Sequence, residues 1–304
     1  MEYRRLGESG LLVSEVGLGT NNFGQRLDQE RTRHVIDRAL DLGITFIDTA
    51  DTYGGGDSER FIGRALGTRR HQVVLATKFG AGSGEKAHQQ GGSRRWIIEC
   101  VEASLRRLDT DYIDLYQMHR PDPGTPILET LQALDDLVRQ GKVRYIGHSN
   151  FGAWQIVDAQ WTARTEHLTH PISAQHHYNL LNRGVERDVL PACRSLGLGL
   201  IPYFPLASGF LTGKYRPGVT PEGTRLAGSP RAASILSDDN FQQLERLHRF
   251  GAERGHTILE LAMGWLLSRP EVSSVIAGAT SPEQVDQNVQ CSQWRLDPAD
   301  LEAV

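Results

Sequence analysis

The sequence predicts an α/β fold in which eight parallel strands and eight helices alternate and close into a (β/α)8 TIM barrel. Short runs rich in β-branched and aromatic residues recur along the 304 residues, and each is followed by a stretch with helical periodicity. Several runs are continuously apolar, as expected of parallel strands buried on both faces. Eight such units in a chain of this length indicate a closed barrel. An open doubly wound sheet is the alternative, but no G-x-G-x-x-G turn follows the first strand.

The predicted strands begin with a hairpin that precedes the barrel. Tyr3–Ser14 alternates around Gly7-Glu8-Ser9-Gly10, which predicts two antiparallel strands that plug the barrel floor. The eight barrel strands are predicted at Val16–Thr20, Ile44–Asp48, Val73–Thr77, Tyr112–Met118, Val143–Gly147, Ile172–Gln175, Gly199–Tyr203 and Ser274–Ala277.

Capping residues mark the ends of the first and last helices of the ring. Asp28 is a good N-cap for the first helix, and Gly43 is a typical residue beyond its end. Ser281 begins the last ring helix, with Pro282 in the first turn and Gln284 three residues after the cap.

Amphipathic periodicity predicts the remaining helices. Trp154 and Trp161 lie seven residues apart, which predicts one packed stripe on their helix. Asp239–Arg254 is predicted as an additional helix, inserted before the seventh crossover helix. The other helices are predicted at Ser58–Leu66, Arg94–Arg107, Ile127–Gln140, Ala153–Ala163, Glu186–Leu196, Thr257–Leu267 and Pro282–Gln290.

Composition limits the classes of protein that the chain can belong to. A net charge of −4 provides no basic field for nucleic acid or an acidic membrane surface. The three cysteines lie far apart and fit neither a zinc site nor a disulfide framework. The most apolar run, Ile258–Leu267, is too short to span a membrane, and no secretion signal is visible at the start. We therefore expect one cytoplasmic domain, residues 1–304, with no metal, nucleic acid or membrane partner.

Four residues at the carboxyl ends of neighbouring strands form a coherent acid–base set. Asp48 is the last residue of the second predicted strand, and Lys78 directly follows the third. His119 directly follows the fourth strand, and Tyr53 lies five residues beyond Asp48. Barrel enzymes keep their chemistry at this rim. A charged Lys78 lowers the pKa of a neighbouring phenol, and Asp48 would hold the ammonium in place. His119 is suited to polarise a carbonyl by donating a hydrogen bond. Singly, each residue also has an ordinary structural role, but together they suit proton transfer to a carbonyl oxygen.

Eight segments of the chain carry a resemblance to a known family. They are Gly17-Leu18-Gly19-Thr20, GITFIDTADTYGGGDSERFIGRAL at 43–66, VLATKFG at 74–80, DYIDLYQMHRPD at 111–122, GKVRYIGHSN at 141–150, Gln175 before HHYN, YFPLASGFLTGKY at 203–215 and IAGATSPEQVDQNV at 276–289. In this order they resemble the aldo-keto reductase superfamily. The pattern is closer to the bacterial reductases and potassium-channel β subunits than to the mammalian aldose reductases.

The resemblance implies roles for the acid–base set and for the nicotinamide end of a cofactor. The four rim residues match the family's catalytic tetrad, with Tyr53 as the general acid. Family members bind a nicotinamide dinucleotide, usually NADPH, across the barrel mouth without a Rossmann fold. Tyr203 matches the aromatic residue that stacks on the nicotinamide. The other positions implied at this end are Gly19, Thr20, Asp48, Ser149, Asn150 and Gln175.

The resemblance also implies a path for the rest of the dinucleotide. The long connection Leu206–Ser237 is expected to order over the pyrophosphate, whereas Phe79–Ser93, with five glycines, is expected to be mobile without ligand. Arg216, Arg225 and Arg231 are interpreted as solvated. The implied contact positions are Leu206, Ser208, Gly209, Leu211 and Lys214 for the pyrophosphate, and Gly278, Thr280, Gln284, Gln287 and Asn288 for the adenosine end.

The function expected from the resemblance is reversible reduction of an aldehyde or ketone to an alcohol with NAD(P)H. The alternative is a cofactor-binding regulatory subunit like the channel β subunits. The lack of a long N-terminal extension and of an evident exposed apolar helix favours the enzyme. Gly278 and Gln284 stand where aldose-reductase-like members carry Lys and Arg for the 2′-phosphate, so we expect a modest preference for NADPH with some use of NADH.

Overall fold

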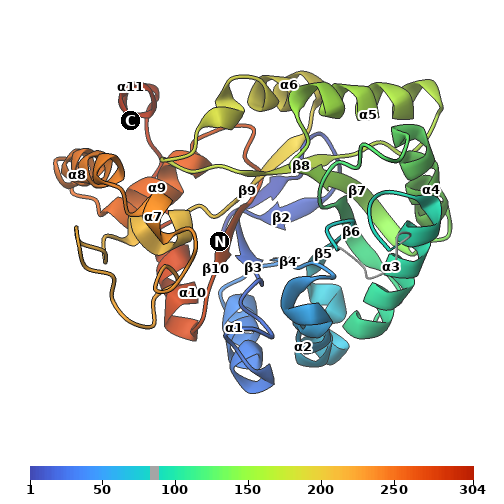
Figure 1. The fold of residues 1–304 in the computed structure, drawn as a ribbon, viewed down its shortest axis with the longest axis horizontal. Helices are drawn as coiled ribbons and strands as arrows, with labels where there is room; N and C mark the ends of the chain where they lie inside the picture. The colour runs from blue at the N-terminus through green and yellow to red at the C-terminus, as the bar shows by residue number, and fades with distance from the viewer. Residues whose placement is uncertain (83–88) are drawn as a thin grey trace.

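Parallel strands closed into a barrel form the centre of the molecule (Figure 1). The computed structural model describes residues 1–82 and 89–304. Within these residues, eight strands follow one another around the barrel in the order β10-β3-β4-β5-β6-β7-β8-β9, which confirms the predicted (β/α)8 barrel. The strands are β3 (Val16–Gly19), β4 (Phe46–Asp48), β5 (Val74–Phe79), β6 (Ile113–Met118), β7 (Val143–Ser149), β8 (Ser173–His177), β9 (Gly199–Tyr203) and β10 (Val275–Gly278).

The predicted N-terminal hairpin is present and closes one end of the barrel. Strands β1 (Tyr3–Arg5) and β2 (Leu12–Ser14) pair antiparallel. Leu6 and Val13 are fully buried and pack against the barrel interior near Phe46, the first residue of β4. The hairpin therefore covers the amino-terminal ends of the strands, and the carboxyl ends remain open for a site.

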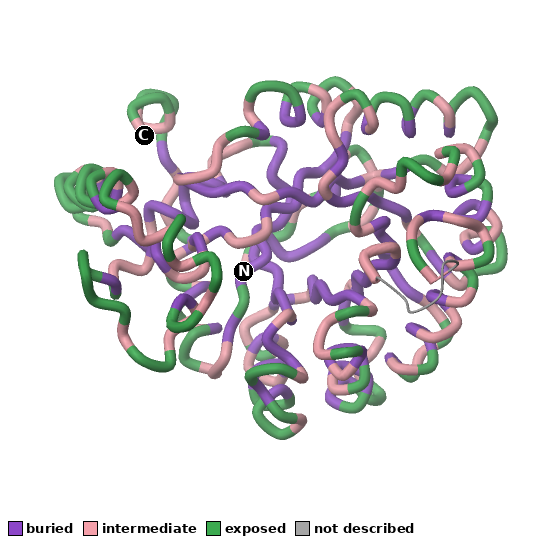
Figure 2. The backbone as a smooth tube through the Cα atoms, in the orientation of Figure 1, coloured by how far each residue is buried: buried purple, intermediate pink, exposed green. Residues whose placement is uncertain are grey.

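Helices surround the barrel, with buried faces toward the strands and exposed faces outward (Figure 2). Asp28 caps the first helix, as predicted, by accepting from the backbone N–H of Arg31. Ser281 makes no side-chain cap on the last ring helix. The ring consists of α1 (Gln29–Asp41), α2 (Asp57–Leu66), α3 (Arg94–Leu108), α4 (Ile127–Arg139), α5 (Ala153–Thr165), α6 (Val189–Leu196), α9 (Ile258–Leu267) and α10 (Pro282–Gln290).

Several elements lie outside the ring. The predicted additional helix is α8 (Asp238–Ala252), which packs beside α9. No helix in the described residues is long and apolar enough to cross a membrane. Short helical segments that the periodicity did not predict are η1 (Tyr53–Gly56), η2 (Gly67–Gln72), η3 (Gly184–Glu186), η4 (Ala207–Thr212), α7 (Ala232–Ile235) and α11 (Pro298–Ala303).

The predicted packed stripe on α5 is wrong. Trp154 and Trp161 are 72% and 69% exposed, and Val157 between them is 46% exposed. Ile156 and Ala159 face the core instead. A spacing of seven places two side chains on one face of a helix but does not determine whether that face meets the barrel or solvent. The described part of the chain therefore presents an apolar, partly aromatic stripe on α5.

Candidate active site

The structure brings together Asp48, Tyr53, Lys78 and His119 at the carboxyl ends of the barrel strands. Asp48 is the last residue of β4, and Lys78 lies on the neighbouring β5. His119 directly follows β6, and Tyr53 begins η1 in the loop after β4. The Lys78 Nζ atom lies 5.4 Å from the centre of the Tyr53 ring, and the His119 ring meets the Tyr53 ring edge-on at 6.0 Å between centroids.

Asp48 and Lys78 form a buried ion pair. The side chain of Lys78 is 0% exposed, and its Nζ atom donates to Asp48 Oδ2 at 2.6 Å and to the Thr49 carbonyl at 2.8 Å. Burial by itself would lower the pKa of Lys78, but the Asp48 carboxylate and the Tyr53 hydroxyl together outweigh it, and the pKa is raised. Lys78 is therefore an ammonium at neutral pH, held by its partner within reach of the Tyr53 ring.

The electrostatics of Tyr53 differ from the prediction. Burial raises the pKa of the phenol, and the Lys78 charge offsets only part of this rise. The expected lowering by Lys78 is present but smaller than the cost of placing a phenolate in a desolvated pocket. Tyr53 therefore carries its proton at neutral pH, which suits a donor.

His119 is a neutral imidazole in this site. Burial, followed by the charges of Lys78 and Arg120, lowers the pKa of His119 to about 3. Its Nδ1 atom is buried without a hydrogen-bond partner among the described residues. A neutral imidazole carries one N–H, so His119 is able to donate one hydrogen bond to a group beside Tyr53.

Two glutamine amides hold the second oxygen of Asp48. Gln175 Nε2 donates to Asp48 Oδ1 at 2.8 Å, and Gln117 Nε2 donates to the same oxygen at 3.3 Å. Gln117 was not predicted. Its signal in the sequence is a polar residue two positions after Leu115 on β6, because alternate residues of a strand point to the same side. Leu115 packs in the barrel interior.

Ser149, Asn150 and Tyr203 form a connected polar group beside the tetrad. Ser149 Oγ donates to the Gln175 carbonyl at 2.9 Å, and Asn150 Nδ2 donates to the His119 carbonyl at 3.0 Å. Tyr203 Oη donates to Asn150 Oδ1 at 2.8 Å, and the His177 ring stacks on Tyr203 at 5.5 Å. These bonds fix the orientation of an amide and an aromatic face that border a hollow of about 240 Å³ shared with Tyr53 and His119.

Gly19 and Thr20 lie on the opposite side of the same hollow. Thr20 Oγ1 donates to the Asp48 carbonyl at 2.9 Å. A Cβ atom on Gly19 would lie 2.5 Å from Ile276 Cγ2, so only glycine allows β3 and β10 to approach here. Both predicted residues line the hollow, as do Ser149, Asn150, Gln175 and Tyr203.

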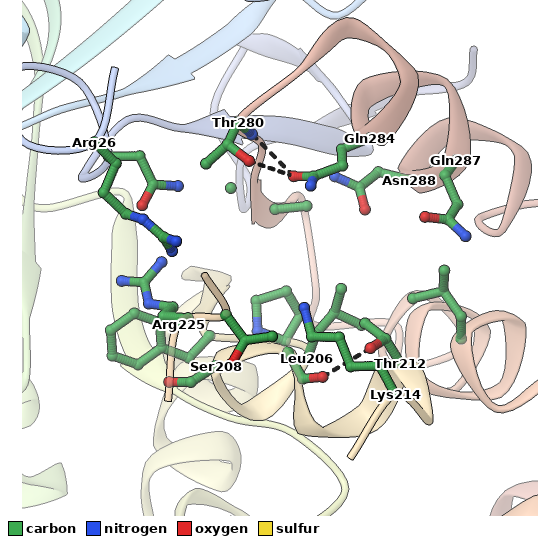
Figure 3. A pocket seen from close by; sticks show the side chains of 18 of the residues that line it. Arg26, Leu206, Ser208, Thr212, Lys214, Arg225, Thr280, Gln284, Gln287 and Asn288 are labelled. Atoms are coloured by element: carbon green, nitrogen blue, oxygen red, sulfur yellow. Dashed lines mark hydrogen bonds between the residues drawn. The ribbon is translucent and has the colours of Figure 1, made fainter. Parts of the chain in front are cut away.

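A second cleft, of about 380 Å³, adjoins the first and is open to solvent (Figure 3). One wall comes from the segment after β9, and the other comes from the end of β10 and from α10 (Figure 3). Gln284 Oε1 accepts from the backbone N–H of Thr280 at 2.9 Å, so Gln284 organises the turn before α10 instead of completing a capping box. The predicted residues that line this cleft are Leu206, Ser208, Gly209, Lys214, Gly278, Thr280, Gln284, Gln287 and Asn288.

Leu211 does not join the predicted cleft residues. Its side chain is 0% exposed and packs in the hydrophobic core, away from the cleft lining. It lies in η4, where left-handed residues turn the chain so that its neighbours face in different directions. The sequence motif alone does not show that the chain turns here and directs Leu211 away from the cleft.

Backbone strain is concentrated at the mouth of the barrel. Asn150, Phe204, Ala207 and Ser208 are non-glycine residues with φ between 45° and 62°. Such conformations are costly for residues with a Cβ atom, and they cluster at functional sites. All but Ala207 line one of the two hollows, which supports this mouth as the functional surface.

The basic residues of the Leu206–Ser237 connection divide into two groups. Arg216 is exposed, and among the described residues its side chain bonds only to the carbonyls of Gly213 and Tyr215, as expected of a solvated side chain. Arg225 is half-buried, lines both hollows and lies 5.1 Å from the Phe204 ring, so its interpretation as solvated is wrong. Arg231 is exposed, yet it also borders the hollow around Tyr53.

Arg26 is a further cleft residue that the sequence did not reveal. It comes from the loop after β3 and donates to the Gly223 carbonyl at 2.7 Å, which ties the two loops together. Figure 3 shows Arg26 and Arg225 at the same end of the cleft, on facing walls, with their guanidinium groups directed toward each other. In the described residues, no cluster of three or more His, Cys, Asp or Glu side chains could hold a metal ion.

The predicted mobility of Phe79–Ser93 falls partly on residues 83–88, which lie outside the described residues. At the end of this connection, Ser93 caps α3 by accepting from the backbone N–H of Trp96 at 3.4 Å. The expected mobility therefore stays a prediction.

The chain belongs to the aldo/keto reductase family. The family model matches residues 15–304, nearly the whole chain. The barrel and the hairpin on its floor are thus the fold of a member of a family of oxidoreductases.

Curated relatives place the chain near the branch that the sequence pattern indicated. A probable voltage-gated potassium channel subunit beta of Oryza sativa subsp. japonica is 39% identical, with 95% of this chain and 90% of the relative covered. The uncharacterized oxidoreductase YrpG of Bacillus subtilis is also 39% identical, with 98% and 93% covered. The L-glyceraldehyde 3-phosphate reductase of Escherichia coli K12 is 34% identical, with 95% and 87% covered.

Proposed function

We propose that this protein reduces an aldehyde or ketone to an alcohol with NADPH, in a reversible reaction. The observation that carries this proposal is the protonated Tyr53 phenol beside a charged, buried Lys78–Asp48 pair, with neutral His119 at its edge. These groups suit the transfer of a proton to a carbonyl oxygen and leave the carbon to accept a hydride.

Each residue of the tetrad has a distinct task in this proposal. Tyr53 donates its proton to the carbonyl oxygen as negative charge develops there. Lys78 stabilises the phenolate that remains, and Asp48 fixes the ammonium in position. His119 donates a hydrogen bond that orients and polarises the carbonyl. The nicotinamide, when bound, supplies the hydride.

The residues present fit a dinucleotide cofactor. Ser149, Asn150 and Gln175 offer donors and acceptors suited to a carboxamide, and the Tyr203 ring offers a stacking face. Lys214 and Arg225 line the neighbouring cleft, and neither forms an ion pair within the described residues. Cations without carboxylate partners are suited to phosphates. We propose that the Leu206–Ser237 connection holds the pyrophosphate and that the Arg26–Gly223 contact secures it.

NADPH is the proposed cofactor, with some use of NADH. Gly278 and Gln284 supply no charge, as the sequence indicated, but Arg26, Lys214 and Arg225 bring three cations to the same cleft.

The similarity to a reductase of a phosphorylated sugar aldehyde supports a small carbonyl substrate. The three cysteines, none of which forms a disulfide, support a cytoplasmic location.

A regulatory subunit is the second candidate, and one observation favours it. Trp154, Val157 and Trp161 form an exposed apolar stripe on α5 in the described chain. The sequence predicts no exposed apolar helix, and that expectation favours a free enzyme; the presence of the stripe removes this support for the enzyme. Relatives named as probable channel β subunits cover 95% of this chain.

Steady-state oxidation of NADPH with a panel of aldehydes separates these functions. We expect multiple turnovers that require Tyr53. Tight NADPH binding with no more than a single turnover for every aldehyde tested would favour the regulatory subunit.

A further inference from the structure

The hollow around Tyr53 is lined by arginines. Arg120, Arg225 and Arg231 border it together with Tyr53 and His119. Its outer opening beside Tyr53 is bordered by Arg26, Arg225 and Arg231. Among the described residues, Asp48 is the one carboxylate on either lining, and Lys78 already neutralises it.

These guanidinium groups have no carboxylate partners in the described part of the chain. Arg225 is half-buried without such a partner, whereas the half-buried Arg70 lies 2.7 Å from Asp114 and the half-buried Arg107 lies 2.6 Å from Glu59. Arg120 and Arg231 are exposed and also take part in no ion pair within the described residues; Arg231 lies 5.5 Å from the face of the Phe204 ring. In a chain of net charge −4, this local excess of positive charge is a specific feature of the mouth.

The arginines divide according to the hollow that they border. Arg26 and Arg225 also border the elongated cleft that Lys214 lines, where cofactor phosphates would neutralise them. Arg120 and Arg231 do not border that cleft and lie on the side of Tyr53 and His119. Their charges are therefore left for another anion, next to the groups that act on the carbonyl.

We infer that the substrate carries a carboxylate or phosphate that Arg120 and Arg231 bind while its carbonyl lies against Tyr53 and His119; this inference rests on the proposed reductase function. In the reaction, the carbonyl carbon gains a hydride and its oxygen gains the Tyr53 proton. NADPH is oxidised to NADP⁺, and the anionic group is unchanged. Arginine is well suited to this role because its planar fork matches both anions.

Matched pairs of aldehydes test the substrate class. Succinic semialdehyde is compared with its methyl ester, and glycolaldehyde phosphate with glycolaldehyde, by kcat/KM at fixed NADPH and salt. We expect at least one anionic member to exceed its neutral partner by about tenfold or more, mostly through KM, and added salt to reduce the difference. A preference in one pair alone identifies the anion as carboxylate or phosphate.

Arginine variants test where that preference arises. R120Q and R231Q are each expected to reduce the anionic-to-neutral ratio by about tenfold. R249Q, an exposed site on α8, removes the same charge away from the mouth and should leave the ratio unchanged. Fluorescence titration of the NADP⁺ complex with the hydroxy acid product should show the same loss of affinity without turnover.

Failure of the inference is distinct from failure of the reductase function. Equal kcat/KM for both members of both pairs, or ratios that R120Q and R231Q leave unchanged, would overturn the anionic substrate while the protein remains a reductase. NADPH oxidation with none of the four aldehydes would reject the reductase function, and the substrate class with it.

Discussion

The four rim residues Asp48, Tyr53, Lys78 and His119 and the adjoining cleft that we propose for the dinucleotide are built in opposite ways. Lys78 is 0% exposed, and both oxygens of Asp48 accept hydrogen bonds from side chains of other barrel strands. In the cleft, Lys214 and Gln284 are exposed, and much of one wall is a loop. Groups fixed on a closed barrel lose little freedom when they act, whereas groups on loops adjust to a ligand.

This difference predicts which substitutions affect turnover and which affect affinity. A buried group has partners that are left unsatisfied when it is removed, so its loss is costly. An exposed cation loses only a screened contact. We therefore expect the barrel half of the site to govern turnover and the loop half to govern cofactor selection.

Tyr53→Phe is expected to have the largest effect on turnover. Loss of the proton donor should reduce kcat by about 10²–10⁴, the usual contribution of a general acid, with NADPH affinity nearly unchanged. Stopped-flow turnover and NADPH titration measure the two quantities. Tyr145→Phe, at a half-buried tyrosine of β7 away from the rim, is the control. A Tyr53→Phe enzyme with a near-normal rate would exclude Tyr53 as the donor.

Lys78→Met is expected to reduce turnover by a similar factor and also to lower the free energy of unfolding. Breaking a buried pair leaves Asp48 charged and uncompensated, at a cost of about 3–5 kcal/mol. Lys142→Met removes the half-exposed pair with Glu102 and should cost less than about 1 kcal/mol. Urea unfolding of both variants makes the comparison. Equal losses in the free energy of unfolding would show that water reaches the Asp48–Lys78 pair in solution.

Substitutions in the cleft should alter cofactor choice while kcat changes little. Arg225→Gln is expected to lower the preference for NADPH over NADH by about tenfold or more, the effect of one charge-assisted contact. Gln284→Arg should raise it, although it removes the acceptor for the Thr280 N–H. Arg216→Gln, on the same connection but exposed, is the matched control. The measurement is kcat/KM for both cofactors at fixed salt, and an initial preference for NADH would refute the proposed phosphate contacts.

The pH dependence should be the smallest effect. Because the pKa of His119 is lowered to about 3, this residue stays neutral throughout the neutral range. Because the pKa of Tyr53 is raised, the phenol keeps its proton until the pH passes above its ordinary value of about 10. Tyr53 and His119 should therefore cause less than about a twofold change in the reduction rate between roughly pH 5 and 8. A larger change in this range is expected only from Asp51, because burial raises the pKa of its carboxyl to about 7. An inflection in this range that disappears in His119→Gln would show that His119 titrates during the reaction.

Much of the barrel and of its rim could be predicted from the sequence. Strand and helix periodicities depend on residues close together in the chain, and the prediction recovered the eight strands and the hairpin. Once the strands are parallel and consecutive, their carboxyl ends share one rim. The proximity of Asp48, Lys78 and His119 follows from that topology.

Contacts between loops that the order of the strands does not determine could not be predicted. Arg26 and Arg225 lie 199 positions apart, yet they face the same cleft because two loops meet there. The burial of Leu211 and the exposure of Trp154 depend on how η4 turns and which face of α5 meets the barrel.

The sequence by itself therefore determined the barrel, the identity of its rim residues and the kind of acid–base chemistry that they suit. Only the tertiary structure decided that Tyr53 keeps its proton and that His119 is neutral. It also decided that arginines without a carboxylate partner among the described residues gather at the mouth. The physical reason is that local patterning reflects short-range backbone and hydrophobic periodicity. Burial and charge proximity instead depend on the whole set of neighbours that folding brings within a few ångströms.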